Sequence, residues 1–249
     1  MLYKARNDPG NAESLSNRFK TILRQGFDKL WPHHCWLCGE HAGAQAVCAA
    51  CDAELPRLIG SVCPCCALPS PGGLCGRCLR RPPDFDATHA AFAYQEPVRS
   101  LVLALKHGRG FMLTDWFVHE LQCCAGDLQA DAVLPMPLHP ARLAERGYNQ
   151  AMELARRFAR QRGLPLLAQA VLRDVDTPHL AGLRQRERRR AVRGVFRCVA
   201  DLRGQHVLVI DDVMTSGATL NELAATLKGR GVTRVSNLLV ARTLRMPGK

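Results

Sequence analysis

The sequence lacks long apolar runs: none of its 249 residues belongs to a stretch approaching the ~20 apolar residues of a membrane span. It also lacks a signal-peptide pattern at its start. We therefore expect a cytoplasmic protein with no membrane span. Aromatic residues are scarce at 6%, whereas proteins that hold single-stranded nucleic acid stack the bases on aromatic rings. The aromatic content therefore gives little support to that class of protein.

Acidic residues are also few: 22 Asp and Glu stand against 34 Lys and Arg, which gives a formal net charge of +12. A positive charge of this size favours polyanionic partners, such as nucleic acid, an anionic surface or a phosphorylated ligand. The net charge alone does not identify the partner, because an arginine-rich composition can also reflect a GC-rich genome. The length allows one α/β domain of ordinary size with a small additional module.

The most informative segment covers residues 207–219 and reads VLVIDDVMTSGAT. Its first four residues are apolar, which is typical of a strand buried on both faces in a parallel sheet. Asp211 and Asp212 follow, then a loop of small residues and a helical run from Leu220. Open α/β sheets bind ligands at this end of a strand. Loop amides and hydroxyls at a helix N-terminus suit a phosphate monoester, and carboxylates beside it suit ribose hydroxyls.

The segment therefore predicts a ribose-5-phosphate site. The two carboxylates would accept hydrogen bonds from ribose hydroxyls, and the loop would surround the phosphate with five residues: Thr215, Ser216, Gly217, Ala218 and Thr219. The alternative is a buried strand whose Asp residues and Thr219 only cap the next helix. One capping residue would suffice for that purpose, so ligand binding is favoured.

Most of the twelve cysteines lie in the first 78 residues. Eight of them form four C-x-x-C pairs, and each such pair lets two thiolates bind one tetrahedral ion. Without a secretion signal the thiols are expected to stay reduced, which favours zinc over disulfides. We expect up to two structural zinc ions, each held by four cysteines in sequential order: Cys35, Cys38, Cys48 and Cys51, then Cys63, Cys66, Cys75 and Cys78.

Other ligand sets stay open at this point, because four pairs can be combined in three ways. Cys65 crowds the third pair and could replace a neighbouring cysteine. Nearby histidines are expected to be bystanders: His33, His34 and His41. Three cysteines without partner spacing are expected to be ordinary buried residues: Cys123, Cys124 and Cys198.

Three regions are predicted along the chain. Residues 1–34 form an N-terminal extension with an amphipathic helix over Ser14–Leu30. A basic helix of this kind can touch a membrane surface, but packing on its own domain is favoured. Residues 35–81 form a double zinc ribbon, which has few large apolar side chains and is expected to need metal to fold. Residues 82–249 form one α/β domain.

Strand and helix patterns alternate in the α/β domain, which indicates a mainly parallel sheet flanked by helices. The expected strands cover residues 90–94, 132–135, 207–210 and 235–240. The expected helices cover residues 97–106, 113–124, 150–161 and 221–230.

Two further segments carry charge suited to the same ligand. Residues 135–142 leave a strand through three prolines and present Arg142, with Arg146 at the next helix start. This stiff loop suits a diphosphate, and a rigid connector with solvated arginines is the alternative. Residues 177–197 hold seven arginines and the single acid Glu187. Such a block repels itself, which indicates a mobile lid that orders around an anion rather than a solvated face.

Together these motifs resemble the ComF family, bacterial proteins that join zinc-ribbon cysteines to a phosphoribosyltransferase-type domain. The resemblance covers about residues 35–243 and includes LKHGR at 105–109 and RGYNQ at 146–150. Residues 207–219 are similar to the phosphoribosyl-diphosphate (PRPP) signature of type I phosphoribosyltransferases. Leu180 departs from the family, which commonly has Gln at that position, so any polar role there is lost.

The resemblance implies a type I phosphoribosyltransferase fold, PRPP as ligand, Mg²⁺ bound with it, and a link to DNA taken up during natural competence. It places the ribose hydroxyls on Asp211 and Asp212 and the 5-phosphate on the loop 215–219. The expected ligands of the diphosphate are Lys106, Arg142 and Arg146. The expected catalytic residues are Asp211, Asp212, Arg188 and Arg189.

Two functions follow from these observations. The favoured one is an enzyme that transfers a phosphoribosyl group to an unidentified acceptor. The other is a non-enzymatic, PRPP-responsive module whose zinc ribbon and basic surface bind single-stranded DNA and serve the competence machinery. The sequence indicates no general base, no acceptor and no oligomeric state.

Overall fold

The computed structural model of the protein describes residues 34–106, 111–177, 187 and 190–244. The chain forms two compact units, residues 1–54 and residues 55–249. In the first unit, residues 34–54 contain a β-bridge between His34 and His41 and the short helix α2 (Ala49–Ala53). The amphipathic helix predicted over Ser14–Leu30 lies outside the described residues.

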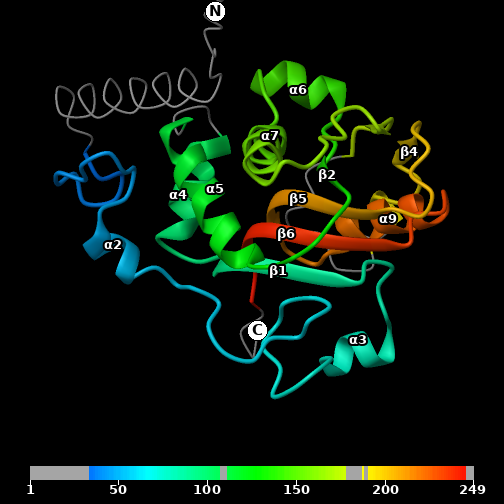
Figure 1. Cartoon of the computed structure of the whole chain (residues 1–249), viewed down its shortest axis with the longest axis horizontal. Helices are drawn as coiled ribbons and strands as arrows, with labels where there is room; N and C mark the ends of the chain where they lie inside the picture. Colours follow the sequence, from blue (N-terminus) through cyan, green and yellow to red (C-terminus); the bar gives the residue numbers. More distant parts are fainter. Residues whose placement is uncertain (1–33, 107–110, 178–186, 188–189, 245–249) are drawn as a thin grey trace, which may run out of the picture. The chain divides into compact units, whose positions relative to one another are not determined.

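The second unit is built on a four-stranded parallel sheet with strand order β1-β6-β5-β2 (Figure 1). A separate antiparallel hairpin pairs β3 with β4. None of the described helices is long and apolar enough to cross a membrane. In chain order the elements of the unit are α3 (Gly76–Arg80), β1 (Ala87–Ala93), α4 (Val98–Lys106), α5 (Phe111–Ala125), β2 (Ala132–Pro135), α6 (Pro140–Arg146), α7 (Gln150–Arg162), β3 (Val171–Arg173), β4 (Phe196–Cys198), β5 (His206–Met214), α9 (Ala218–Lys228) and β6 (Arg234–Arg242).

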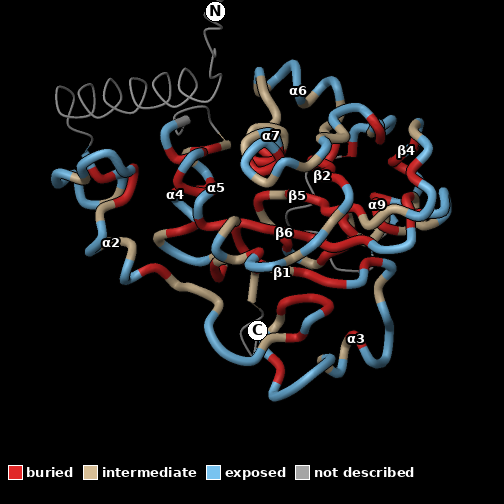
Figure 2. The backbone as a smooth tube through the Cα atoms, in the orientation of Figure 1, coloured by how far each residue is buried: buried red, intermediate tan, exposed pale blue. Residues whose placement is uncertain are grey.

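Helices cover both faces of the sheet, so its central strands β5 and β6 are buried along most of their length (Figure 2). Successive side chains of a strand point to opposite faces. Val207 and Val209 pack in the same apolar cluster as Leu223 of α9. Leu208 and Ile210 therefore point to the other face, where α5 and α7 pack on the strands. The predicted parallel sheet with flanking helices is confirmed.

The second half of the cysteine-rich region shares the core of the second unit. Cys63 and Cys66 are buried in the apolar cluster that contains Phe85 and Leu223. The boundary between the units, at Glu54, therefore falls inside the region 35–81 that the sequence predicts as one ribbon module. A short, turn-rich segment buries little apolar surface alone, and packing on the sheet supplies the remainder.

Two local predictions are wrong. The stiff loop expected after β2 continues as helix α6 from Pro140, because a proline fits the first helical position and the His139 side chain accepts a backbone hydrogen bond as the cap. Arg197, predicted as part of the lid, lies in β4 and donates two hydrogen bonds to Asp174 at 2.6 and 3.0 Å. This bidentate pair holds Arg197 in the β3–β4 hairpin.

The cysteines without partner spacing are not uniformly buried. Cys198 is buried in β4, whereas Cys124 is half-buried and Cys123 is exposed. On α5 the buried side chains include Phe117 and Leu121. The helical period places residue 123 away from this face, so the prediction of a buried Cys123 is wrong.

Candidate functional site

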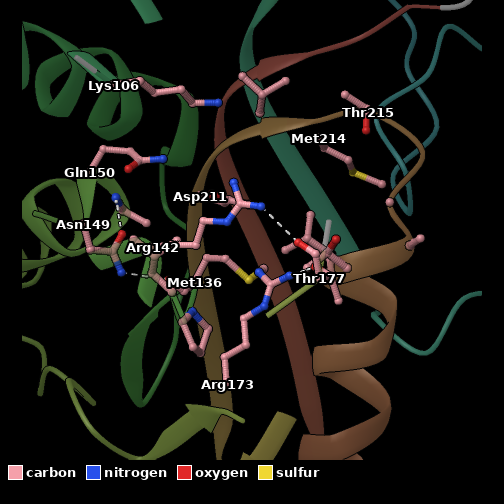
Figure 3. Close-up of a pocket in the computed structure, with 18 of the residues that line it drawn as sticks. Lys106, Met136, Arg142, Asn149, Gln150, Arg173, Thr177, Asp211, Met214 and Thr215 are labelled. Atoms are coloured by element: carbon pink, nitrogen blue, oxygen red, sulfur yellow. Dashed lines mark hydrogen bonds between the residues drawn. The ribbon is translucent and has the colours of Figure 1, made fainter. Parts of the chain in front are cut away.

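A cavity of about 280 Å³ lies at the carboxyl ends of β2 and β5 (Figure 3). Parallel α/β sheets bind ligands at this edge, and the volume is close to the lower end, about 300 Å³, of small-molecule pockets. The cavity brings together most of the residues predicted to bind the ligand: Lys106, Arg142, Arg146, Asp211, Thr215, Ser216, Gly217, Ala218 and Thr219. Asp212 does not line it, and Arg188 and Arg189 lie outside the described residues.

The loop of residues 214–219, called here the phosphate loop, connects β5 to α9. Gly217 is the N-cap residue of α9 and has a φ of 77°. The backbone conformation favours glycine, and a Cβ at this position would lie 2.4 Å from Cε of Met214, so the end of that flexible side chain would have to move. Because the N-cap residue is glycine, it offers no side-chain hydrogen bond to the helix, and Thr219 lies inside α9. The interpretation of the segment as simple helix capping is therefore wrong.

The two adjacent carboxylates have different surroundings. Asp211 lines the cavity, whereas Asp212 is only 5% exposed and forms an ion pair with Lys106, with Nζ and Oδ2 2.6 Å apart. Burial and the charge of Asp212 raise the pKa of Asp211 well above its ordinary value. Burial also opposes ionisation of Asp212, but the ion pair with Lys106 outweighs it and lowers the pKa of Asp212. Asp211 is therefore the carboxylate placed to contact a ligand.

Two arginines converge on Thr177 beside the cavity (Figure 3). Arg142 donates to the carbonyl oxygen of Thr177 at 3.1 Å, and Arg173 donates to the Thr177 hydroxyl. Arg142 also forms an ion pair with Asp176 at 3.1 Å. Burial, and then the charge of Arg142, lower the pKa of Arg173. Two like charges held together in a cavity indicate a binding site for an anion.

Arg173 is a site residue that the sequence motifs do not reveal. It lies at the end of β3, in a segment with no turn signal, no glycine-rich loop and no resemblance to a family motif. The only available signal is its position at the end of a strand that leads into the predicted lid.

Asn149 and Gln150 connect the cavity to α7. The side chain of Asn149 donates to the carbonyl of Met136 at 3.1 Å and accepts from the amides of Ala151 and Met152, so it caps the helix and holds the end of β2. Gln150 lines the cavity and is buried, and its Oε1 has no hydrogen-bond partner within the described part of the chain. An unsatisfied buried oxygen costs about 1–3 kcal/mol. A ligand that donates to Gln150 would remove this cost.

The first cysteine cluster belongs to the first unit. Its four Sγ atoms lie within 4.8 Å of one another and come from Cys35, Cys38, Cys48 and Cys51. Sγ of Cys38 and Cys48 are 3.8 Å apart, the separation of about 3.8 Å expected for two sulfurs on tetrahedral zinc. Burial opposes ionisation of Cys35, but backbone amides, Cys48 first, lower its pKa to about 6. His34 and His41, the two nearby histidines within the described residues, are not part of the cluster.

The second cysteine cluster, in the second unit, is built the same way. It contains Cys63, Cys66, Cys75 and Cys78. Sγ of Cys66 and Cys75 are 3.6 Å apart, and amide hydrogen bonds outweigh burial and lower the pKa of Cys63 to about 7. Cys65 stays outside, with its thiol donating to the Phe85 carbonyl at 3.6 Å. Both clusters group the cysteines sequentially, and four thiolates fit a closed zinc site that supplies structure rather than catalysis.

Comparison with known proteins identifies both parts of the chain. Residues 26–79 match the double zinc ribbon domain, and residues 143–243 match the phosphoribosyl transferase domain. The chain is 31% identical over 227 residues to DNA utilization protein YhgH of Salmonella typhimurium, covering 86% of this chain and 98% of the relative. It is 29% identical over 178 residues to Competence protein F of Haemophilus influenzae, covering 68% and 78%.

Among solved structures, the chain is similar to glutamine PRPP amidotransferase from B. subtilis, with 18% identity and a TM-score of 0.37. That similarity covers 53% of this chain and 27% of the amidotransferase. The matched domains define a phosphoribosyltransferase-type protein that carries a double zinc ribbon. Within this class, the chain belongs to the ComF family, with relatives named for DNA utilization and competence.

Proposed function

We propose that the protein binds PRPP in this cavity and transfers its phosphoribosyl group to an acceptor, in a role connected with the use of DNA. The observation that carries the proposal is the set of groups that the cavity brings together: amides and hydroxyls of the phosphate loop, the carboxyl of Asp211, and a group of cations. These three kinds of group match the 5-phosphate, the ribose hydroxyls and the diphosphate of PRPP. The names of the relatives support the connection with DNA.

Each part of the site has a defined task in this reaction. The phosphate loop holds the 5-phosphate at the N-terminus of α9, and Asp211 accepts a hydrogen bond from a ribose hydroxyl. Arg142, Arg146 and Arg173 neutralise the diphosphate, which leaves with the electron pair of the C1–O bond. Mg²⁺, when bound with PRPP, would supply further neutralisation of the diphosphate oxygens. The remaining contribution of the protein is to position C1 for attack by the acceptor.

A second function is favoured by one observation on the cavity. The described residues that line it include no aromatic side chain, whereas pockets for small organic ligands are lined predominantly by apolar and aromatic side chains. A site that holds PRPP without a surface for a flat acceptor suits a PRPP-responsive module. In that case the basic surface and the zinc ribbon would bind single-stranded DNA.

Incubation with PRPP, Mg²⁺ and a panel of bases and single-stranded nucleic acids, with diphosphate release as the readout, separates the two functions. Transfer predicts release that depends on one acceptor and is lost in Asp211→Asn. The module predicts no release, but a change in the affinity for single-stranded DNA when PRPP is added. A protein that does not bind PRPP at all would contradict both functions.

A further inference from the structure

Two arginines hold the phosphate loop from behind. Nη1 of Arg242 donates to the carbonyl oxygens of Met214, at 2.8 Å, and of Thr215. Nη2 of Arg77 donates to the carbonyl oxygen of Ser216 at 2.7 Å. Three consecutive carbonyls of the loop are therefore engaged by guanidinium groups. Neither arginine lines the cavity.

This arrangement determines where the loop amides point. The peptide bonds of the loop are trans, and in a trans peptide the carbonyl and the next N–H point in opposite directions. With the carbonyls of residues 214–216 turned toward the arginines, the N–H groups of residues 215–217 point away from them. Thr215, Ser216 and Gly217 line the cavity, whereas Arg77 and Arg242 do not. The arginines thus orient the donors that a phosphate needs.

Both arginines are connected to the second cysteine cluster. Arg77 lies in α3 between Cys75 and Cys78. Arg242, at the end of β6, is 1% exposed, and its Nε donates to the carbonyl oxygen of Cys66 at 2.9 Å. A buried guanidinium needs its donors satisfied, so Arg242 keeps the backbone of the cluster and the loop in one arrangement. A space of about 20 Å³ separates the cluster from the loop, which leaves room for about one water molecule.

We propose that the second cysteine cluster acts through Arg77 and Arg242 to position the phosphate loop, so that metal in this cluster increases the affinity of the cavity for a 5-phosphate. This inference rests on the proposed function of the cavity. Metal bound by Cys75 and Cys78 would fix the short helix between them and hence the Arg77 side chain. Without metal the carbonyl of Ser216 loses a fixed donor, and its peptide is free to turn.

The test compares Arg77→Ala with Arg80→Ala, which removes the same charge from an exposed position of the same helix. Calorimetric titrations with PRPP, ribose 5-phosphate and inorganic diphosphate give three dissociation constants for each variant. For Arg77→Ala we expect PRPP and ribose 5-phosphate to bind about tenfold more weakly, because a charged hydrogen bond is lost, and diphosphate to bind as before. Arg80→Ala is expected to bind all three like wild type. Arg77→Lys is expected to recover part of the affinity, because it still presents a cationic donor.

The metal is tested with one cysteine variant in each cluster, Cys75→Ser in the second and Cys48→Ser in the first. Zinc content, measured on each protein, verifies that one cluster has lost its metal. Ribose 5-phosphate is expected to bind more weakly to the folded Cys75→Ser protein and unchanged to Cys48→Ser. If Cys75→Ser does not fold, the Arg77 variants decide the role of the arginine, since they keep every cysteine, and titrations of ribose 5-phosphate into wild type at increasing zinc content decide the role of the metal.

Two results would overturn the inference while leaving the proposed function intact. One is equal affinity of Arg77→Ala and Arg80→Ala for ribose 5-phosphate in a protein whose wild type binds it. The other is an equal loss of all three ligands in Arg77→Ala, which would show general damage instead of a turned loop. A wild-type protein that binds neither PRPP nor ribose 5-phosphate would contradict the proposed function itself.

Discussion

The two ends of the cavity offer different groups to a negatively charged ligand. The phosphate loop offers neutral amides and hydroxyls, and its glycine and the carbonyl contacts of Arg77 and Arg242 fix its conformation. The other end offers the cations Lys106, Arg142, Arg146 and Arg173. Two of these already have carboxylate partners, Asp212 for Lys106 and Asp176 for Arg142.

The two ends would contribute to binding in different ways. Fixed amides need little rearrangement to meet a phosphate, so they give geometric specificity. A paired guanidinium must leave or share its carboxylate, so its net contribution to affinity is smaller than its charge indicates. In the proposed function, ribose 5-phosphate would use the loop and not the cationic end, whereas PRPP would use both. Comparing these two ligands therefore separates the two ends.

Lys106→Met tests the cationic end and should have the largest effect. Asp212 is buried and loses its cation, so the free energy of unfolding at neutral pH should fall by about 3 kcal/mol. In wild type the pKa of Asp212 is lower in the folded protein than in the unfolded chain. The ionised carboxylate therefore stabilises the fold at pH values above its ordinary pKa, and this stabilisation is lost as the pH falls through the lowered pKa. In the variant, burial raises that pKa and the carboxyl takes up a proton.

The difference in unfolding free energy between wild type and Lys106→Met should therefore shrink as the pH falls. Urea denaturation at several pH values measures it. Lys228→Met is the matched control, because Lys228 pairs with Asp86 on the surface and should contribute at most about 1 kcal/mol. A difference that is the same at every pH would contradict the role given to Asp212.

Gly217→Ala tests the loop end. The positive φ and the contact with Met214 should together lower the free energy of unfolding by about 1–3 kcal/mol. Affinity for ribose 5-phosphate and for PRPP should fall by the same factor, since both use the loop. Gly204→Ala is the control, because Gly204 has a φ of 76° but open space around it. If the two variants bind ribose 5-phosphate equally well, the loop is not the phosphate site.

Arg142→Ala should weaken the binding of only one of the two ligands, whereas Gly217→Ala should weaken the binding of both. PRPP should bind about tenfold more weakly, as expected when one charged hydrogen bond is lost, and ribose 5-phosphate should bind as in wild type. Arg156→Ala, which removes an exposed arginine paired with Glu153 on α7, provides the control for net charge. Competition titrations with both ligands give the ratio of the dissociation constants for PRPP and ribose 5-phosphate directly. A parallel loss of both ligands would contradict the assignment of Arg142 to the diphosphate.

The smallest effect is expected from pH, because Asp211 is proposed to contact the ribose between the two ends. Its raised pKa means that the carboxyl must lose a proton before both of its oxygens are free to accept hydrogen bonds from ribose hydroxyls. Affinity for ribose 5-phosphate should therefore rise as the pH rises through that pKa and then become constant. The phosphate of the ligand also titrates, near pH 6, so Asp211→Asn serves as the reference. Identical pH profiles for the two proteins would exclude a titrating Asp211.

Much of the fold could be predicted from sequence, because its signals are local. The strand at 132–135 and the apolar residues 207–210 read directly as buried parallel strands. The β3–β4 hairpin could not be predicted, because its strands are short and pair across a long separation. The compact units also divide the cysteine-rich region in a way that spacing does not show, since packing of the second cluster on the sheet is a tertiary effect. The domain limits 1–34, 35–81 and 82–249 stay predictions.

The site was predictable where motifs follow strand ends. The loop 215–219 and Arg142 could be assigned from position, because the carboxyl ends of β5 and β2 meet at one edge. The separation of Asp211 from Asp212 was not predictable, since alternation along the strand and the partner Lys106 decide it. Arg77 and Arg242 act on the loop from distant parts of the sequence, 139 and 27 residues away, and no spacing rule connects them.

Calorimetric titration of PRPP with Mg²⁺ into wild type and Asp211→Asn tests the central claim most directly. We expect one PRPP bound per chain, weaker binding of ribose 5-phosphate, and a clear loss of PRPP affinity in Asp211→Asn while the protein stays folded. Absence of PRPP binding to wild type, or equal affinity of the two proteins for PRPP, would contradict it.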